Sequence, residues 1–266
     1  MSDYLDRFGG MARLFSQPGL ERLREARVAV IGLGGVGTWA AEALARSGVG
    51  GMTLVDLDEI CLTNVNRQLP ALDGELGRSK AQVMAERIRR IAPECQVRVR
   101  REFYSERTAP AIFAEGLAGV VDAIDSVPHK CHLIQACHSR RLPLVVCGGA
   151  GGKRDGTQVR IRDLAATGRD PLLYQVRRRL RREFGFPKGE GVRFGVDAVV
   201  SSERPVFPGE GGCVVRERPP GEDMRLNCER GFGTASFVTG AFGLAAAGRL
   251  VERLAASEET TPESSR

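Results

Sequence analysis

Paired cysteines are missing from this sequence. Its seven cysteines lie at positions 61, 95, 131, 137, 147, 213 and 228, and no two of them have the C-x-x-C spacing. This absence argues against a zinc ribbon and against a disulfide framework. The first residues also lack the apolar stretch of a secretion signal, because Asp3, Asp6 and Arg7 interrupt them. We therefore expect a cytoplasmic protein with reduced thiols, several of them simply buried.

Long hydrophobic runs are scarce as well. Residues 231–248 carry no charge, but they are rich in Gly and Ala and contain few large apolar side chains. This stretch is shorter than the roughly 20 apolar residues that a membrane-spanning helix needs. We interpret it as part of a final helix that ends near Leu254 and packs inside the protein or against a second copy. No membrane partner is expected. The composition, 42% hydrophobic and 27% charged over 266 residues, is that of a globular protein with a large core.

A P-loop is also absent, since no G-x-x-x-x-G-K-[ST] pattern occurs. A different glycine turn takes its place. A buried parallel strand is predicted over residues 28–31 and an Ala-rich helix over residues 39–46. The turn between them can approach a phosphate closely, and its candidate nucleotide-binding residues are Gly32, Gly34, Gly35 and Gly37.

The second predicted strand, residues 52–55, ends in two acids. Asp56 and Asp58 lie where a carboxylate holds a ribose hydroxyl in folds of this kind. The order of strand, glycine turn, helix and acidic strand end predicts an adenine nucleotide site. It indicates an α/β fold with a Rossmann-like parallel sheet.

More positive charge follows than a dinucleotide site uses. Asn64, Arg67 and Gln68 come soon after the acids, and Lys80 opens a helix predicted over residues 80–91. A cation at a helix start opposes the helix dipole, and a bound phosphate removes that conflict. The pattern therefore favours a nucleoside triphosphate and disfavours an NAD-dependent oxidoreductase.

A further buried strand, over residues 119–124, leads to Asp125 and Ser126. At the carboxyl end of such a strand, Asp125 is well placed to bind Mg²⁺ together with phosphate oxygens. A cap for the helix predicted over residues 128–139 is the alternative role. Asp122, inside the strand, is expected to be paired internally. Cys131, His132, Cys137 and His138 lie on that helix, but no four ligands with suitable geometry for a metal are visible, and we interpret the two cysteines as core residues.

Nearly all the excess positive charge lies in one segment, residues 169–193, which holds eight Arg or Lys and three Asp or Glu. A helix capped by Asp170 is predicted over residues 171–184. Its apolar face is formed by Leu173, Val176, Leu180 and Phe184. Four arginines are predicted to face away from that side: Arg177, Arg178, Arg181 and Arg182. A solvated surface is one interpretation, but five arginines within six residues favour contact with RNA phosphates.

The alternation of strands and helices weakens beyond residue 155. We expect one domain over residues 1–254, with a nucleotide core at 20–153, an elaboration at 154–254 and a disordered tail at 255–266. The elaboration should contain a strand within residues 195–203 and a mobile loop over 208–223. Cys228 is a candidate nucleophile or a structural thiol, and the sequence leaves both open.

Several motifs resemble those of the adenylating E1-like family, which includes the activators of sulfur-carrier and ubiquitin-like proteins. They are GLGGVG, TNVNRQ and DAIDSV. RFGG-x-ARL, CGGAGGK, FGVD and GFGTAS are similar to motifs of one branch, which cyclises threonylcarbamoyladenosine in the anticodon loop of tRNA. The similarity covers about residues 7–254. It implies the E1-like (ThiF) fold with a C-terminal elaboration, with ATP and Mg²⁺ as cofactors.

The resemblance also implies roles for individual residues. Arg67, Lys80 and Arg7 neutralise the phosphates while the threonyl carboxylate of the tRNA is adenylated, and Asp125 holds Mg²⁺. The protein is expected to be a homodimer in which Arg7 reaches the partner's ATP. A cysteine desulfurase system is a further expected partner. Two alternatives stay open: adenylation of the C-terminus of a small sulfur-carrier protein, and a nucleotide-sensing module whose ATP turnover is incidental.

Overall fold

The computed structural model describes residues 3–168, 170–217 and 232–256. These residues form a central sheet with the strand order β3-β2-β1-β4-β5-β7-β6. Neighbouring strands run parallel, except that β6 is antiparallel to β7. The predicted α/β fold with a Rossmann-like parallel sheet is confirmed. The strands are β1 (Arg27–Ile31), β2 (Gly51–Val55), β3 (Gln96–Arg100), β4 (Gly119–Asp122), β5 (Leu144–Cys147), β6 (Val159–Asp163) and β7 (Asp197–Ser201).

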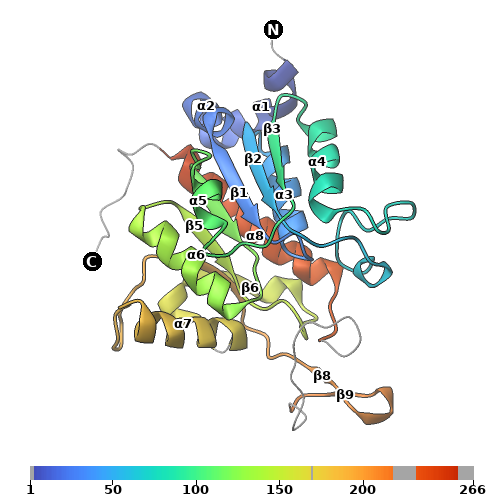
Figure 1. Ribbon diagram of the computed structural model, residues 1–266, viewed down its shortest axis with the longest axis vertical. Coiled ribbons are helices and arrows are strands. Elements are labelled where there is room, and N and C mark those ends of the chain that lie inside the picture. The colour runs from blue at the N-terminus through green and yellow to red at the C-terminus, as the bar shows by residue number, and fades with distance from the viewer. Residues whose placement is uncertain (1–2, 169, 218–231, 257–266) are drawn as a thin grey trace.

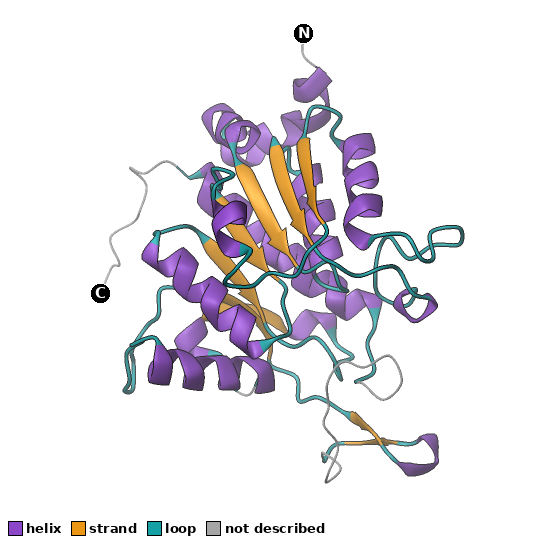
Figure 2. Cartoon of the chain, in the orientation of Figure 1, coloured by secondary structure: helices purple, strands orange, loops and turns teal. Residues whose placement is uncertain are grey.

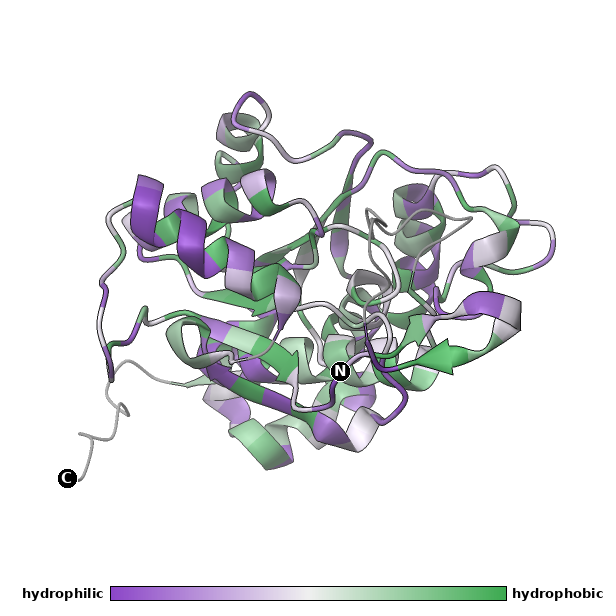
Figure 3. Ribbon diagram, turned by 90° about the horizontal axis from the view of Figure 1, so that it is seen from below, coloured by the Kyte–Doolittle hydropathy of each residue, from purple (hydrophilic) through white to green (hydrophobic). Residues whose placement is uncertain are grey.

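Helices cover both faces of this sheet (Figures 1 and 2). One apolar cluster joins the sheet to α1 (Asp3–Phe15), α2 (Gln17–Glu25), α3 (Gly37–Arg46), α4 (Lys80–Ile91) and α8 (Ser236–Ala255). The opposite cluster contains α5 (Ala109–Phe113), α6 (Val127–Ser139) and α7 (Pro171–Glu183). Coloured by hydropathy, the strands at the centre are largely hydrophobic, and hydrophilic residues lie along the outer sides of the helices (Figure 3).

The strand order reverses between β1 and β4. The chain adds β2 and β3 on one side of β1, then returns to place β4 on the other side. At such a point the two loops that leave the carboxyl ends of adjacent strands diverge to opposite faces, and the crevice between them binds ligands in open α/β sheets. The glycine turn after β1 and the loop that contains Asp125 after β4 therefore lie side by side.

The last helix, α8, packs inside the protein. Val238, Phe242, Ala246 and Leu250 are fully buried, which confirms the interpretation of the uncharged stretch as a packing helix. Gly243 allows close contact with α3, because a Cβ at this position would lie 2.5 Å from the carbonyl oxygen of Val36. Within the described ranges, every helix is too short or too polar to span a bilayer.

The N-terminal segment forms two helices, which break at Ser16 (φ +68°), where the Ser16 hydroxyl accepts the amide of Gly19. Two other regions differ from the expectations. Strand β6 was not predicted at all. Part of the expected mobile loop at 208–223 instead pairs as a short hairpin of β8 (Phe207–Pro208) and β9 (Val214–Val215). Residues 218–223, Cys228 and most of the expected disordered tail lie outside the described residues.

Candidate active site

The glycine turn is rigid on one side and open on the other. Gly32 has φ +89°, and its amide donates to Val55 O at 2.9 Å. A Cβ on Gly37 would lie 1.8 Å from Gly32 O, so no side chain fits where α3 begins. A Cβ on Gly34, in contrast, would meet no atom within 4 Å. The turn therefore leaves open space at Gly34, where a phosphate can approach the start of α3.

Asp56 holds the glycine turn in place. One of its carboxylate oxygens accepts the amide of Leu33 at 2.6 Å, and the other accepts the amide of Asp58 at 2.8 Å. Burial raises the pKa of Asp56, and these two amides and the nearby charge of Lys80 oppose part of the rise. Each carboxylate oxygen can accept a second hydrogen bond. Asp56 can therefore hold the turn and also accept a ribose hydroxyl, and the ribose contact stays a prediction.

Lys80 brings a buried positive charge to the same edge of the sheet. It is 6% exposed, and its Nζ lies 2.8 Å from Oδ2 of Asp58, whose own side chain is half exposed. Ser79 caps α4 by accepting the amide of Gln82. The ammonium therefore lies at the first helical residue, where the dipole disfavours it and a bound anion would stabilise it.

Arg67 flanks the glycine turn from the loop after β2. Its Nη1 donates to Thr63 O at 2.6 Å, and its own carbonyl oxygen accepts the indole N–H of Trp39 at 3.1 Å. A Cβ on Gly35 would lie 3.2 Å from the Arg67 Cγ. The aliphatic part of the Arg67 side chain and the turn are therefore neighbours, and the binding of phosphate by this pair stays a prediction.

Asn64 and Gln68, in the same loop, are both buried. The side-chain oxygen of Asn64 accepts the amide of Cys61 at 3.1 Å, so this residue orients the loop. The Oε1 atom of Gln68 is buried without a hydrogen-bond partner among the described residues. Such an orphaned acceptor is costly unless a ligand or water donates to it.

Asp122 is paired internally, as expected, and its partner is Lys130. The two side chains are fully buried, with Nζ 2.8 Å from Oδ1, and Oδ1 also accepts the amide of Ile124 at 3.0 Å. Burial raises the pKa of Asp122, and the charge of Lys130 opposes the rise. The pair fixes the loop that runs from β4 to α6, which contains Asp125.

We expect Lys130→Met to reduce the free energy of unfolding by about 3–5 kcal/mol, because it leaves Asp122 buried without its counter-ion. Without Lys130 the folded-state pKa of Asp122 rises further above its unfolded value. A carboxyl shifted in this direction stabilises the fold at low pH and loses that contribution as pH rises. Urea unfolding should therefore show a smaller deficit near pH 5 than near pH 8. A deficit that grows on acidification would contradict this assignment.

Asp125 is exposed, and Ser126, not Asp125, occupies the N-cap position of α6. The capping role considered for Asp125 is therefore wrong. Among the described residues, no three His, Cys, Asp or Glu side chains gather as a metal cage. Mg²⁺ is commonly held by one or two carboxylates plus phosphate oxygens. One exposed carboxylate beside an open phosphate position fits an ion that arrives with a nucleotide.

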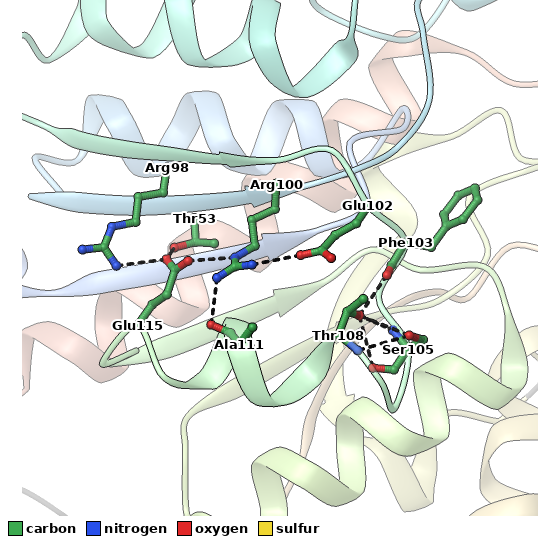
Figure 4. Close-up of polar contacts among 9 residues, drawn as sticks. All are labelled: Thr53, Arg98, Arg100, Glu102, Phe103, Ser105, Thr108, Ala111 and Glu115. Carbon is green, nitrogen blue, oxygen red and sulfur yellow. Dashed lines mark hydrogen bonds and ion pairs between the residues drawn. The ribbon is translucent and has the colours of Figure 1, made fainter.

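A polar network fixes the loop after β3 beside this site (Figure 4). Arg100 donates to Glu115 at 2.8 Å and to Ala111 O at 2.9 Å, which ties β3 to α5. Thr108 donates to Phe103 O at 2.9 Å. The carbonyl oxygen of Arg100 accepts the amide of Asp56, so the network supports the end of β2 directly. This hydrogen bond keeps Asp56, at the acidic end of β2, aligned with the end of β3.

Residues 10–265 match the ThiF family, and relatives cover almost the whole chain. The chain belongs to the ThiF family. It is 45% identical over 251 residues to a tRNA threonylcarbamoyladenosine dehydratase of Escherichia coli, covering 94% of each chain. It is 43% identical over 255 residues to the dehydratase of Haemophilus influenzae, covering 96% of this chain and 95% of that protein. The E. coli dehydratase in complex with ATP has a similar crystal structure, with 42% identity over 96% of each chain and a TM-score of 0.84.

Other members of the ThiF family match less of the chain. An E. coli molybdopterin-synthase adenylyltransferase is 33% identical over 144 residues, which is 54% of this chain. The two dehydratases cover 94% and 96% of this chain, so they share the C-terminal elaboration as well. The resemblance to the E1-like family and to its tRNA-modifying branch is therefore confirmed.

The structure does not bring Arg7 to the nucleotide site of its own chain. Arg7 pairs with Asp3 at 2.7 Å and lines a pocket of about 240 Å³ together with Gly50 and Gln96, which precede or begin β2 and β3. This pocket lies at the amino-terminal edge of the sheet, opposite the glycine turn. In this ThiF-family protein Arg7 can therefore serve a nucleotide only in another copy of the chain.

The prediction that Arg177 faces outward with its neighbours is wrong. Arg177 is 7% exposed, and it donates to Thr167 Oγ1 and, at 3.0 Å, to Gly168 O. Its partners belong to the turn that precedes α7, so it fixes this turn. Arg178 and Arg182 are exposed, and Arg181 is half-buried. The apolar face is as predicted, with Leu173, Val176 and Leu180 fully buried.

Two buried lysines escaped the sequence analysis. Lys130 pairs with Asp122 across a turn, and Lys153 is 4% exposed, with its Nζ 3.6 Å from Asp170 and donating to Gly149 O. Asp170 also accepts the amides of Gly149 and Leu173, at 2.9 Å each. Lys153 thus holds the glycine-rich loop after β5 to the start of α7. The lysine that ends the CGGAGGK run was the available signal.

Proposed function

We propose that this protein dehydrates threonylcarbamoyladenosine in the anticodon loop of tRNA, using ATP, and so forms the cyclic nucleoside. The observation that carries the proposal is that two tRNA threonylcarbamoyladenosine dehydratases are similar to this protein over almost the whole chain, beyond the nucleotide core. A likeness to the ATP complex of the E. coli enzyme at TM-score 0.84 supports ATP as the cosubstrate.

The chemistry follows from the substrate. A carboxylate is a poor electrophile, because its charge is delocalised and oxide is a poor leaving group. Attack of a carboxylate oxygen on the α-phosphorus of ATP forms a mixed anhydride and releases pyrophosphate. The carbamoyl group of the same nucleoside then attacks the activated carbonyl, loses a proton and expels AMP. Because this closure is intramolecular, no protein nucleophile is needed.

The residues at the glycine turn supply what the first step requires. Arg67 and Lys80 neutralise negative charge as it shifts toward pyrophosphate, and the open space at Gly34 admits the phosphates. Asp56 and Asp58 are the residues proposed to bind the ribose. Gln68, whose Oε1 has no hydrogen-bond partner among the described residues, orients the phosphates or the loop. Asp125, with Ser126 beside it, holds Mg²⁺. When bound, Mg²⁺ polarises phosphate oxygens and screens their charge.

The function is tested by incubating the protein with ATP, Mg²⁺ and threonylcarbamoylated tRNA, then digesting the RNA to nucleosides. Mass spectrometry should show loss of one water from the modified nucleoside, together with AMP. AMP formation with a carrier peptide but not with tRNA would favour the sulfur-carrier alternative, and nucleotide binding without turnover would favour the sensing module.

We further propose that the protein works in the cytoplasm, because its two proposed substrates, tRNA and ATP, are both present there.

We further propose that the active protein is a homodimer in which Arg7 completes the partner's site. Arg7→Ala and Lys80→Met should each be nearly inactive alone. Mixed, unfolded and refolded together, they should regain about a quarter of wild-type activity, since a mixed dimer keeps one intact site. No recovery after mixing, with mixed dimers demonstrated, would contradict a role for Arg7 across the interface.

A cysteine desulfurase system is the further proposed partner, and co-purification of the two proteins tests this proposal.

A further inference from the structure

A basic pocket lies on the outer side of α7. It encloses about 350 Å³ and is lined by Tyr174, Arg177, Arg178, Arg181, Arg182 and Lys188. Helix α7 lies at the lower left of the molecule in Figure 1, next to α6. Its N-cap residue Asp170 accepts the amide of Gly149, just beyond the carboxyl end of β5. The pocket therefore belongs to the helix that begins at the edge of the sheet where the nucleotide site lies.

The positive charge of this pocket is poorly compensated. Glu183 is shared between Arg179, at 2.5 Å, and Arg182. Neither Arg178 nor Lys188 forms a hydrogen bond or ion pair with any residue that the structure describes. Positively charged side chains that lie close together without acidic partners repel one another. A bound polyanion would reduce this repulsion.

The side chains also distinguish between kinds of anion. Leu173, Val176 and Leu180, which form the apolar face of α7, are fully buried, so this face is not free to insert into a membrane. Tyr174 is 57% exposed at the pocket, and the Arg177 guanidinium lies 5.9 Å from its ring centroid. Single-stranded nucleic acid offers both groups that this arrangement suits, a phosphate for the arginines and a planar base for the aromatic ring. An acidic peptide offers no such base.

We propose that this pocket binds a single-stranded segment of the tRNA substrate, with its backbone phosphates on Arg178 and Lys188 and an unstacked base on Tyr174. Arg177 positions the turn before the helix instead of contacting RNA. The proposal rests on the proposed function, because it assigns a binding surface to the substrate of that reaction.

The test uses a double variant that carries Arg178→Glu and Lys188→Glu in one protein. The variant Arg90→Glu is its control. Arg90 is an exposed arginine on α4, against the opposite face of the sheet. The double variant should raise the KM for threonylcarbamoylated tRNA at least tenfold at about 0.1 M salt, and its tRNA affinity should depend less on salt. The Kd for ATP and the kcat at saturating tRNA should stay within twofold of the control.

Tyr174 is tested separately. Tyr174→Ala should raise the KM for tRNA about 5- to 150-fold, the range measured for lost base stacking, and Tyr174→Phe should restore it. The proposal is overturned if the double variant uses tRNA as the control does. It is also overturned if the variants lose binding to phosphatidylserine vesicles and keep tRNA affinity. In both cases wild-type protein would still form the cyclic nucleoside, whereas failure of the proposed function would remove that product from wild type itself.

Discussion

Lys80→Met is expected to lower the kcat for cyclic nucleoside formation by about 10²- to 10³-fold, the usual loss when one preorganised charge on a transition state is removed. Lys80 is buried, and methionine preserves most of its volume and apolar contacts. Its partner Asp58 is half exposed, so water can solvate the carboxylate that remains. Thermal unfolding should therefore show a small shift beside the large loss of rate.

Asp58→Asn distinguishes two possible roles of Lys80. The lysine can stabilise the phosphates by its charge, or its ion pair with Asp58 can hold the loop in position. This variant removes the pairing carboxylate but leaves the ammonium at the start of α4. If Lys80 acts on phosphate, Asp58→Asn should lose less than about tenfold in kcat. Equal losses in Lys80→Met and Asp58→Asn would show that the pair positions the loop, and the role assigned to Lys80 would then be wrong.

Gly37→Ala is expected to destabilise the fold by at least about 3 kcal/mol or to prevent folding, since strong overpacking has costs of this size. The added Cβ would lie 1.8 Å from the carbonyl oxygen of Gly32, which is backbone and cannot rotate away. The start of α3 would have to move, together with its contact to α8. Urea unfolding measures the loss.

Gly34→Ala is the matched variant in the same turn. Its Cβ meets no atom within 4 Å, so the unfolding free energy should stay within about 1 kcal/mol of wild type. The methyl group does occupy the space assigned to the phosphates, and titration calorimetry should show ATP binding weakened at least tenfold. Wild-type affinity for ATP in Gly34→Ala would place the phosphates elsewhere.

Local patterns in the sequence were enough to predict the nucleotide half of the protein. The strand before Gly32 is apolar at every position, which is typical of strands buried on both faces, and glycine spacing fixed the turn. The acids at positions 56, 58 and 125 follow strand ends, so their shared edge could be inferred from parallel topology alone. The helix at 80–91 has the predicted limits.

The failures have a common cause in contacts that depend on how the elements pack against one another. Strand β6 exposes most of its residues and joins the sheet only because β7 offers an antiparallel edge. Arg177 looks like its neighbours in sequence, but the turn at Thr167 and Gly168 provides acceptors that bury it. The pairing of Lys130 with Asp122 depends on how α6 returns over β4. None of these contacts leaves a periodic signal in the chain.

The most direct test of the account follows the oxygen atoms of the threonyl carboxylate. The tRNA is prepared with ¹⁸O in this carboxylate and incubated with protein, ATP and Mg²⁺. If the carboxylate attacks the α-phosphorus and AMP is then expelled, one labelled oxygen must appear in the phosphate of AMP. Label in inorganic phosphate or only in water, with AMP unlabelled, would contradict adenylation as the activating step.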